Sequence, residues 1–513
     1  MKSLIPFLVC FFAGGLYALS YPSFLGFEIF PFLFLGLFLF LKSLNKEHKL
    51  SRILGLIFCY NLGLNVFGFY WVPQTLREFG HLPYVVSLIL GFFFSLILQP
   101  HWWVFGLWRK FRFQFAWTSS LGLFISAVIL TLTERYMPQQ FPIYAGSPWL
   151  SLAPYLGLAP YFGASLFSFM TYWSVMELVC QLESKKVRAF NWVALFIFII
   201  LNFALGLKNS ETGKDFNVRI VQANIGNFLK VASENGDLNS FDSINENYKK
   251  LSTGQNGFSP DLIVWPETAF SSSFSGRQNK LPKLLTDIME TEKSEMLIGG
   301  YDQDTSKSPF DMFETIYNSA LLLNNDGIKA GYHKNILIPF GETLPLGPLN
   351  RKVAEMVPAI SLFARGKGTP IMETRDQHRF VTPICYEILD SEYMRSLLNE
   401  HGQNSLMVNL TNDSWYGDTA EPYQHLFLSK WRALEFQLPI VRSTNTGISS
   451  VIFPDGSESK RMMIGESNYL DVNLKLSQRA PTLYQEYGIL PLLGLLLGLL
   501  GIIAFLKKNE NRP

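Results

Sequence analysis

Charged residues are scarce in this chain of 513 residues, where aspartate, glutamate, lysine and arginine together make up 16%. A typical soluble domain has about 25%. The deficit is confined to residues 1–207 and 488–506, whereas residues 208–487 have an ordinary globular balance. We therefore expect a membrane part and one soluble domain. The formal net charge of +2 shows no basic excess, so no nucleic-acid partner is expected.

Cysteine is also scarce, with four residues in all. Cys10, Cys59 and Cys180 lie in apolar stretches, where cysteine usually acts as a small buried hydrophobe. Cys385 is alone between residues 208 and 487, so it has no disulfide partner within that segment. Its thiol is therefore either inert and buried or kept free for chemistry. The sequence has no evident Gly-rich phosphate loop or Cys/His cluster, so neither a cofactor nor a metal is predicted.

Eight apolar stretches are each suited to crossing a hydrocarbon core of about 30 Å. Seven lie near residues 4–20, 26–41, 53–72, 83–106, 116–132, 161–181 and 190–207, and the eighth is 488–506. The first could also be a signal peptide, but six more stretches follow it and no clean cleavage site is evident. The predicted domains are thus a seven-span part (1–207), a soluble domain (208–487), and an eighth span with its tail (488–513).

Basic residues predict the orientation of these spans. Lysine and arginine gather within residues 42–52, 109–112, 185–188 and 507–512, whereas the alternating loops carry only Arg77 and Arg135. Because basic loops stay in the cytoplasm, both termini are expected there and the soluble domain outside. In a bacterium with two membranes, this predicts a multi-pass inner-membrane protein with a periplasmic domain.

The soluble segment alternates β-prone runs with helical patterns. The runs lie at 218–225, 261–265, 296–300, 319–323, 380–385, 405–410, 440–443 and 447–453, and helical patterns at 281–292, 386–400 and 423–436. This alternation predicts an α/β domain. A hairpin signal at residues 325–327, and the lack of a helix between the last two runs, favour mixed sheets.

Three residues that could carry chemistry each end a β-prone run: Glu267, Lys334 and Cys385. A carboxylate can take the proton of a thiol nucleophile, and a lysine can stabilise an oxyanion. The helical pattern after Cys385 is expected to favour the thiolate. Taken singly, Glu267 and Lys334 could be ordinary loop residues, and Glu342 could simply cap a helix or pair with a base.

Five segments, taken together, favour a functional role for these residues over an ordinary structural one. They are Trp265-Pro-Glu267, Tyr332-His-Lys334, Pro339-Phe-Gly-Glu342, Ile384-Cys385-Tyr386-Glu387 and Asn409-Leu-Thr-Asn412-Asp413-Ser-Trp415-Tyr-Gly417. With the arrangement of seven spans and one, the chain resembles the nitrilase superfamily and, within it, the membrane-embedded apolipoprotein N-acyltransferases. The resemblance implies a soluble domain built as an α-β-β-α sandwich.

The resemblance also implies roles for single residues. Glu267 would be the general base, Lys334 the oxyanion-stabilising lysine and Cys385 the nucleophile, with support from Glu342, Tyr386 and Glu387. The implied reaction moves the sn-1 acyl chain of a membrane phospholipid, through a cysteine thioester, to the free N-terminal amine of an S-diacylglyceryl-cysteine lipoprotein. A monomer without cofactor or metal is expected.

Two points remain open at this stage. The family often has a tryptophan after a Leu-Lys pair near the first strand, whereas here Leu229-Lys230 is followed by Val231. Residues 345–370 could form a lid, a loop that dips into the membrane, or an ordinary packed loop. The alternative functions are a membrane-tethered amidase or nitrilase, and a transporter or receptor whose outer domain only binds.

Overall fold

The computed structural model describes residues 4–510 with several gaps. The gaps are residues 81, 112–118, 140, 186–188, 208–212, 255, 275–280, 304–314, 340, 345–346, 348–349, 351, 353–361 and 401. The N-terminal part is helical. It comprises α1 (Ile5–Ala18), α2 (Pro31–Asn45), α3 (Leu50–Gly68), α4 (Val72–Gly80), α5 (Tyr84–Phe94), α6 (His101–Phe111), α7 (Ser120–Tyr136), the 3₁₀ helix η1 (Ser147–Leu152), α8 (Ala159–Ser184) and α9 (Ala189–Ala204), and α17 (Leu490–Glu510) packs against α7 and α8.

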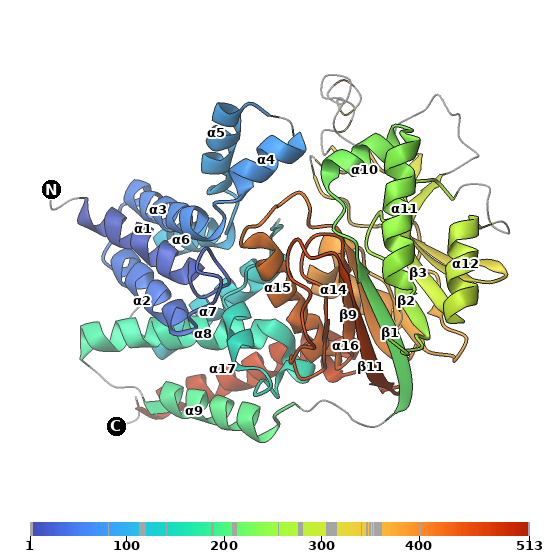
Figure 1. The fold of residues 1–513 in the computed structure, drawn as a ribbon. Helices are drawn as coiled ribbons and strands as arrows, with labels where there is room; N and C mark the ends of the chain where they lie inside the picture. The colour runs from blue at the N-terminus through green and yellow to red at the C-terminus, as the bar shows by residue number, and fades with distance from the viewer. Residues whose placement is uncertain are drawn as a thin grey trace.

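Only part of the eight-span prediction can be compared with these helices. Within the described residues, α3 is the helix that has both the length and the apolar character to cross a bilayer. Five shorter helices are also apolar: Ile5–Ala18, Pro31–Asn45, Tyr84–Phe94, Ala189–Ala204 and Leu490–Phe505. Helix α1 begins, and α17 ends, on the side of the helical part that lies away from the sheets (Figure 1).

The apolar stretch predicted near residues 83–106 is not one continuous helix. Helix α5 ends at Phe94 and α6 begins at His101, with turns between them. Pro100 directly precedes α6; it has no N–H to donate and disfavours helical backbone at Gln99. Because the whole stretch is apolar, its composition does not indicate the break between Phe94 and His101.

Glycines let the backbones of α1 and α3 come into direct contact. A Cβ added to Gly14 of α1 would lie 1.9 Å from the Tyr60 carbonyl oxygen of α3. One added to Gly63 of α3 would lie 1.8 Å from the Phe11 carbonyl oxygen. Close approach through small residues is how helices associate where no hydrophobic drive acts between them.

The soluble part contains two sheets. Its elements are β1 (Lys214–Gln222), α10 (Asn227–Glu234), α11 (Leu238–Ser252), β2 (Leu262–Val264), α12 (Lys283–Glu292), β3 (Glu295–Gln303), β4 (Ile316–Asn324), β5 (Gly327–His333), β6 (Met372–Glu373), β7 (Arg379–Val381), the 3₁₀ helix η3 (Cys385–Leu389), α14 (Ser391–Glu400), β8 (Leu406–Thr411), α15 (Glu421–Phe436), β9 (Ile440–Thr444), β10 (Ser450–Ile452), β11 (Asn468–Leu476) and α16 (Leu483–Tyr487). The strand orders are β11-β1-β2-β3-β4-β5 and β10-β9-β8-β7-β6.

The predicted mixed sheets are confirmed. Strands β1, β2 and β3 pair in parallel, as do β7, β8 and β9, whereas the remaining pairs are antiparallel. The hairpin predicted around residues 325–327 joins β4 to β5. The α/β prediction did not include β11, whose alternate residues are polar and half exposed at the sheet edge.

Alternation along the strands produces the layers. Val221, Ile263 and Met296 turn toward α11 and α12 and share a core with Tyr248 and Leu285. Residues of opposite parity, such as Val218 and Val264, share a core with strands of the second sheet, and β1 contacts β9. Helices α14 and α15 lie on the outer side of that second sheet (Figure 1). The predicted α-β-β-α sandwich is confirmed.

Helix α15 connects this sandwich to the helical part. The Gln424 side chain donates to the carbonyl oxygens of Pro22 and Gly68, each at 2.8 Å. Nearer the C-terminal end of α15, the ring of Trp431 packs on Phe167 of α8 at 5.2 Å between centroids. The site described next therefore lies on a domain firmly attached to the helices.

Candidate active site

Cys385 lies at a tight turn between a strand bridge and a helix. Ile384 bridges Leu410 of β8, and Cys385 is the first residue of η3, with φ at 54°. A residue other than glycine in this left-handed region costs free energy and often marks a functional position. The single helix expected over residues 386–400 is wrong: η3 ends at Leu389 and α14 begins at Ser391.

The predicted acid and base residues are brought together around Lys334. Its Nζ lies 3.1 Å from Glu267 Oε1 and 2.8 Å from Glu342 Oε1. Lys334 is 1% exposed, and both carboxylates are also buried. Burial alone would lower the pKa of Lys334, but the charges of Glu267 and Glu342 outweigh it and raise that pKa well above its usual value. The lysine is therefore a fixed positive charge.

Two asparagines hold the carboxylates: Asn318, which the sequence did not single out, and Asn412, which belongs to the quoted motif at residues 409–417. Asn318 Nδ2 donates to Glu267 Oε1 at 2.7 Å and to Glu342 Oε1 at 3.3 Å. The backbone N–H of Asn412 donates to Glu267 Oε2 at 2.9 Å. Each oxygen of Glu267 thus accepts a hydrogen bond, which fixes the plane of the carboxylate. Only the polar character of Asn318 within an apolar strand could have drawn attention to it.

Cys385 is buried beside this group, and its resting form is the thiol. Burial, and then the charge of Glu267, raise the pKa of Cys385 well above its ordinary value, while Lys334 opposes the rise. Burial of the sulfur thus opposes the expected preference of the following helix for the thiolate. That helix is one short 3₁₀ turn, and desolvation of the sulfur outweighs its dipole. Nucleophilic attack must then be accompanied by removal of a proton.

Glu387 ties the turn that carries Cys385 to the loop after Lys334. Its Oε1 accepts from the N–H groups of Asn335 at 2.6 Å and Ile336 at 2.8 Å. Its Oε2 accepts from the N–H of Ile384 at 2.8 Å and from Tyr332 Oη at 2.7 Å. Burial raises the pKa of Glu387 to about 7, against the lowering effect of these donors. Its carboxyl group is therefore placed to hold both loops.

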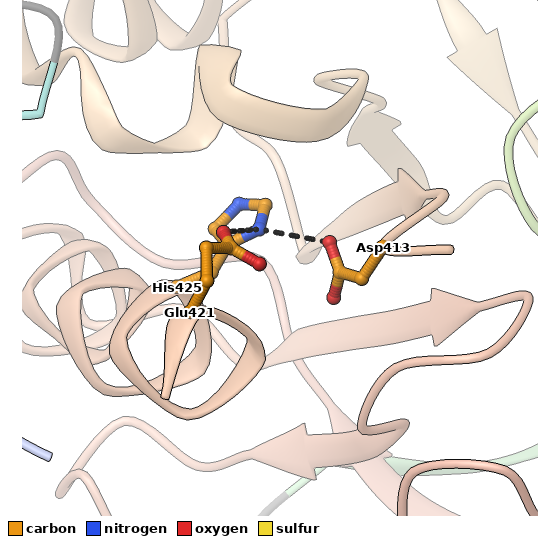
Figure 2. A group of neighbouring side chains, drawn as sticks. All are labelled: Asp413, Glu421 and His425. Carbon is orange, nitrogen blue, oxygen red and sulfur yellow. Dashed lines mark hydrogen bonds and ion pairs between the residues drawn. The ribbon is translucent and has the colours of Figure 1, made fainter. Parts of the chain in front are cut away.

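Tyr386 points toward a second buried cluster. Its hydroxyl donates to Glu421, and its ring stacks on His425 with centroids 4.4 Å apart. His425 Nδ1 lies 3.3 Å from Asp413 Oδ1 and 3.8 Å from Glu421 Oε1 (Figure 2). Asp413, Glu421 and His425 carry donor atoms close enough together to hold a metal ion.

Arg442 already supplies the positive charge of this cluster. Its Nη2 lies 2.9 Å from Asp413 Oδ2 and 3.1 Å from His425 Nδ1, where it would repel a cation. Burial and Arg442 lower the pKa of His425, and burial followed by Asp413 raises that of Glu421. The neutral forms of both side chains are favoured, so these residues fit a hydrogen-bonded support better than a metal site.

A cavity of about 370 Å³ lies between the end of α7 and the loops that contain Ile336 and Tyr386. It is lined by Arg135, Tyr144, Ile336, Tyr386 and Glu392, among others. Arg135 pairs with Glu392 and donates to Tyr484 Oη at 2.8 Å. The helical part therefore reaches the segment that directly follows the predicted nucleophile.

The two open points of the sequence have different outcomes. Val231 lies half exposed on α10, and the neighbouring Lys230 side chain donates to Thr268, next to Glu267. Most of segment 345–370, for which a lid, a membrane-dipping loop and a packed loop were all open, lies outside the described residues. The predicted roles of Glu267, Lys334, Cys385, Glu342, Tyr386 and Glu387 remain predictions at this point.

Models of known protein families match both the soluble part and the helical part of the chain. The model of the carbon–nitrogen hydrolase family matches residues 217–482. The model described as the N-terminal domain of apolipoprotein N-acyltransferase matches residues 13–176. The chain therefore belongs to the carbon–nitrogen hydrolase family.

Curated relatives narrow this assignment. An apolipoprotein N-acyltransferase of Bdellovibrio bacteriovorus is 29% identical over 85% of this chain and 83% of its own length. One of Haemophilus influenzae is 28% identical over 100% of this chain and 97% of its own length. Among solved structures, an amidase from Nesterenkonia sp. is 16% identical over 54% of this chain and 95% of that one, with a TM-score of 0.35. The predicted resemblance to the apolipoprotein N-acyltransferases is confirmed. The prediction that the chain is an enzyme of that acyltransferase class is confirmed as well.

Proposed function

We propose that the chain transfers an acyl chain from a membrane phospholipid to the N-terminal amine of a diacylglyceryl-cysteine lipoprotein. The observation that supports this most directly is the buried group of Glu267, Lys334 and Glu342 beside Cys385. The group belongs to a sandwich attached to apolar helices, and both parts match the corresponding family models. A thiol, a base and a fixed cation are what acyl transfer through a thioester requires.

The first half-reaction forms the acyl-enzyme. Glu267 takes the proton of Cys385, and Sγ attacks the carbonyl carbon of the sn-1 ester. Lys334 and the Tyr386 N–H stabilise the oxyanion. The tetrahedral intermediate then expels the sn-1 oxygen of the glycerol, which takes the proton from Glu267 and leaves as lysophospholipid. A thioester on Cys385 remains.

The second half-reaction consumes the thioester. The free α-amine of the lipoprotein attacks the thioester carbonyl, and Glu267 accepts a proton from the nitrogen. The oxyanion forms again at Lys334 and the Tyr386 N–H. The C–S bond breaks, the sulfur recovers a proton from Glu267, and the product is an amide. The cycle leaves no net change in the enzyme and consumes no nucleotide.

Membrane location follows from the substrates. Both substrates are lipids, so an enzyme in a bacterial inner membrane with a periplasmic domain would meet them by lateral diffusion. Eight spans with cytoplasmic termini agree with the four basic clusters of the sequence. Glu267, Lys334 and Glu342 meet within one chain, and a functional monomer is proposed on that basis.

The acyl-enzyme is the intermediate to test. Incubation of the purified protein with phospholipid alone should add the mass of one acyl group, which hydroxylamine should remove. Cys385→Ala should abolish the adduct. Cys10→Ala, Cys59→Ala and Cys180→Ala are matched controls and should keep it. An adduct that persists in Cys385→Ala would contradict the proposed nucleophile.

A further inference from the structure

A side chain on β8 holds the peptide bond between Cys385 and Tyr386 from behind. Asn409, on β8, donates from Nδ2 to the carbonyl oxygen of Cys385 at 3.2 Å. The same Nδ2 donates to the carbonyl oxygen of Pro383 at 3.0 Å. Asn409 is fully buried, so water does not compete for these bonds. The backbone on both sides of Ile384 is thereby fixed to the centre of the second sheet.

Fixing that carbonyl also fixes an N–H group. In a trans peptide the C=O and the following N–H point in opposite directions. The carbonyl of Cys385 points to Asn409, so the N–H of Tyr386 points away from β8. Tyr386 is the second residue of η3, and the first amides of a helix have no acceptor within it. This N–H is therefore available to a ligand atom beside the nucleophile.

Arg442 determines which way the Asn409 amide faces. Its Nη1 donates to Asn409 Oδ1 at 2.7 Å. A guanidinium can only donate, so the atom facing it must be the amide oxygen, and the nitrogen must face Cys385. Arg442 is itself fully buried and held by Asp413 and the carbonyl of Ile448. A continuous path of hydrogen bonds thus runs from Arg442 through Asn409 to the catalytic turn.

We propose that Asn409 and Arg442 are positioning residues that orient the Tyr386 N–H as an oxyanion donor. The inference deepens the proposed function and rests on Cys385 as its nucleophile. It assigns to the hydrogen bonds behind the turn a role in the tetrahedral intermediate, rather than in forming the thiolate. Loss of one oxyanion donor typically lowers kcat by about 10²–10³-fold, which sets the size of the expected effect.

Two reactions of Cys385 separate this role from a merely structural one. Acylation by p-nitrophenyl butyrate passes through a tetrahedral oxyanion. Alkylation by iodoacetamide is a direct displacement that needs the thiolate but forms no oxyanion. A residue that only orients the N–H should affect the first reaction and leave the second almost unchanged. Both reagents are independent of the natural lipids.

The experiment uses the full-length protein in detergent and two variants of Asn409. Asn409→Asp keeps the oxygen that Arg442 binds and loses the donor to Cys385, whereas Asn409→Ala loses both without adding charge. We expect acylation to slow by about 100-fold in each, with alkylation changed by less than about threefold. Arg442→Lys, which cannot reproduce the same geometry, should show a smaller loss of the same kind.

Asn404→Asp is the matched control. Asn404 is also buried and donates from Nδ2 to two carbonyl oxygens, those of Leu398 and Gly402, but it lies before β8 and away from the turn. Its acylation rate should match that of the unsubstituted protein. Equal losses of acylation and alkylation in the Asn409 variants would overturn the inference, as would unchanged acylation. If the unsubstituted protein reacts with the p-nitrophenyl ester but not with phospholipid, the proposed donor fails while the inference stands.

Discussion

Lys334 is held so tightly between Glu267 and Glu342 that its position matters as much as its charge. Its Nζ lies within 3.1 Å of both carboxylates, and the side chain is almost fully buried. We predict that Lys334→Arg lowers acyl-enzyme formation by at least about 100-fold, although the positive charge is retained, because a planar guanidinium cannot occupy the same point. Single-turnover acylation would measure this. A near-normal rate would indicate that Lys334 acts only through its charge.

The protonation state of Cys385 gives a pH prediction. Burial and the charge of Glu267 raise the pKa of Cys385 well above its ordinary value, so the thiol dominates throughout the neutral range. The rate of alkylation by iodoacetamide should therefore rise about tenfold per pH unit through pH 9 without levelling, whereas an unperturbed cysteine levels near pH 8.5. Because Glu267 contributes to the rise, Glu267→Gln should alkylate faster at pH 8 while being acylated more slowly. Slower alkylation in that variant would contradict the electrostatic account.

At the scale of elements, Glu387 connects the turn that contains Cys385 to the loop after β5 by hydrogen bonds. It accepts three backbone N–H groups and one hydroxyl with two oxygens. In Glu387→Gln one oxygen becomes an amide nitrogen that faces donors, so buried N–H groups lose their acceptor. We expect a loss of about 1–3 kcal/mol in the free energy of unfolding and a lower acylation rate. Thermal unfolding in detergent checks the first, and unchanged stability would argue against this connection.

The same elements show what the sequence could predict. Glu267, Lys334 and Cys385 were each predicted to end a β-prone run and to act in one chemistry, and the structure places Glu267 and Lys334 in direct contact. The turn chemistry of residues 325–327 predicted the hairpin. These predictions were possible because periodicity and turn residues act locally.

Other features depend on contacts that no local pattern contains. Asn318 lies unmarked within an apolar strand, and the motif that contains Asn409 does not indicate its partners; only the folded arrangement reveals that they bind a carboxylate and the turn of Cys385. The break at Asp390 divides a helical pattern because Glu387 holds η3 and the Asp390 side chain accepts from the N–H of Tyr393 in the first turn of α14. The roles of polar residues within apolar strands therefore follow from their tertiary contacts, which the local sequence does not show.

For the whole molecule, orientation is the first prediction. The basic clusters predict that a phosphatase fused after residue 209 is active in the periplasm and that a fluorescent protein fused after Lys508 is active in the cytoplasm. The beginning of α1 and the end of α17 lie on the same side of the helical part (Figure 1). Reporters on the same side of the membrane would contradict the arrangement of seven spans and one, and with it a periplasmic site.

The choice between transferase and hydrolase depends on how the two parts of the molecule meet. A thioester reacts with water as well as with an amine, so a transferase must keep its acyl-enzyme poorly hydrated. The helical part contributes aromatic rings at this position: Phe141 packs on Tyr386 at 5.4 Å between centroids, and Trp71 packs on Tyr416 at 5.4 Å. These rings lie beside the residue that follows the nucleophile, where an isolated soluble domain would be open to solvent.

We therefore predict a long-lived acyl-enzyme in the absence of an acceptor. A diacylglyceryl-cysteinyl peptide with a free α-amine should discharge it quickly, and the same peptide N-acetylated should be inert because it has no nucleophile. Trp71→Ala would open the aromatic contact, so it should shorten the lifetime of the acyl-enzyme without acceptor by releasing free fatty acid. The measurement is the decay of the acyl adduct with and without peptide. Steady release of fatty acid by the unsubstituted protein, at a rate equal to transfer, would instead favour a hydrolase.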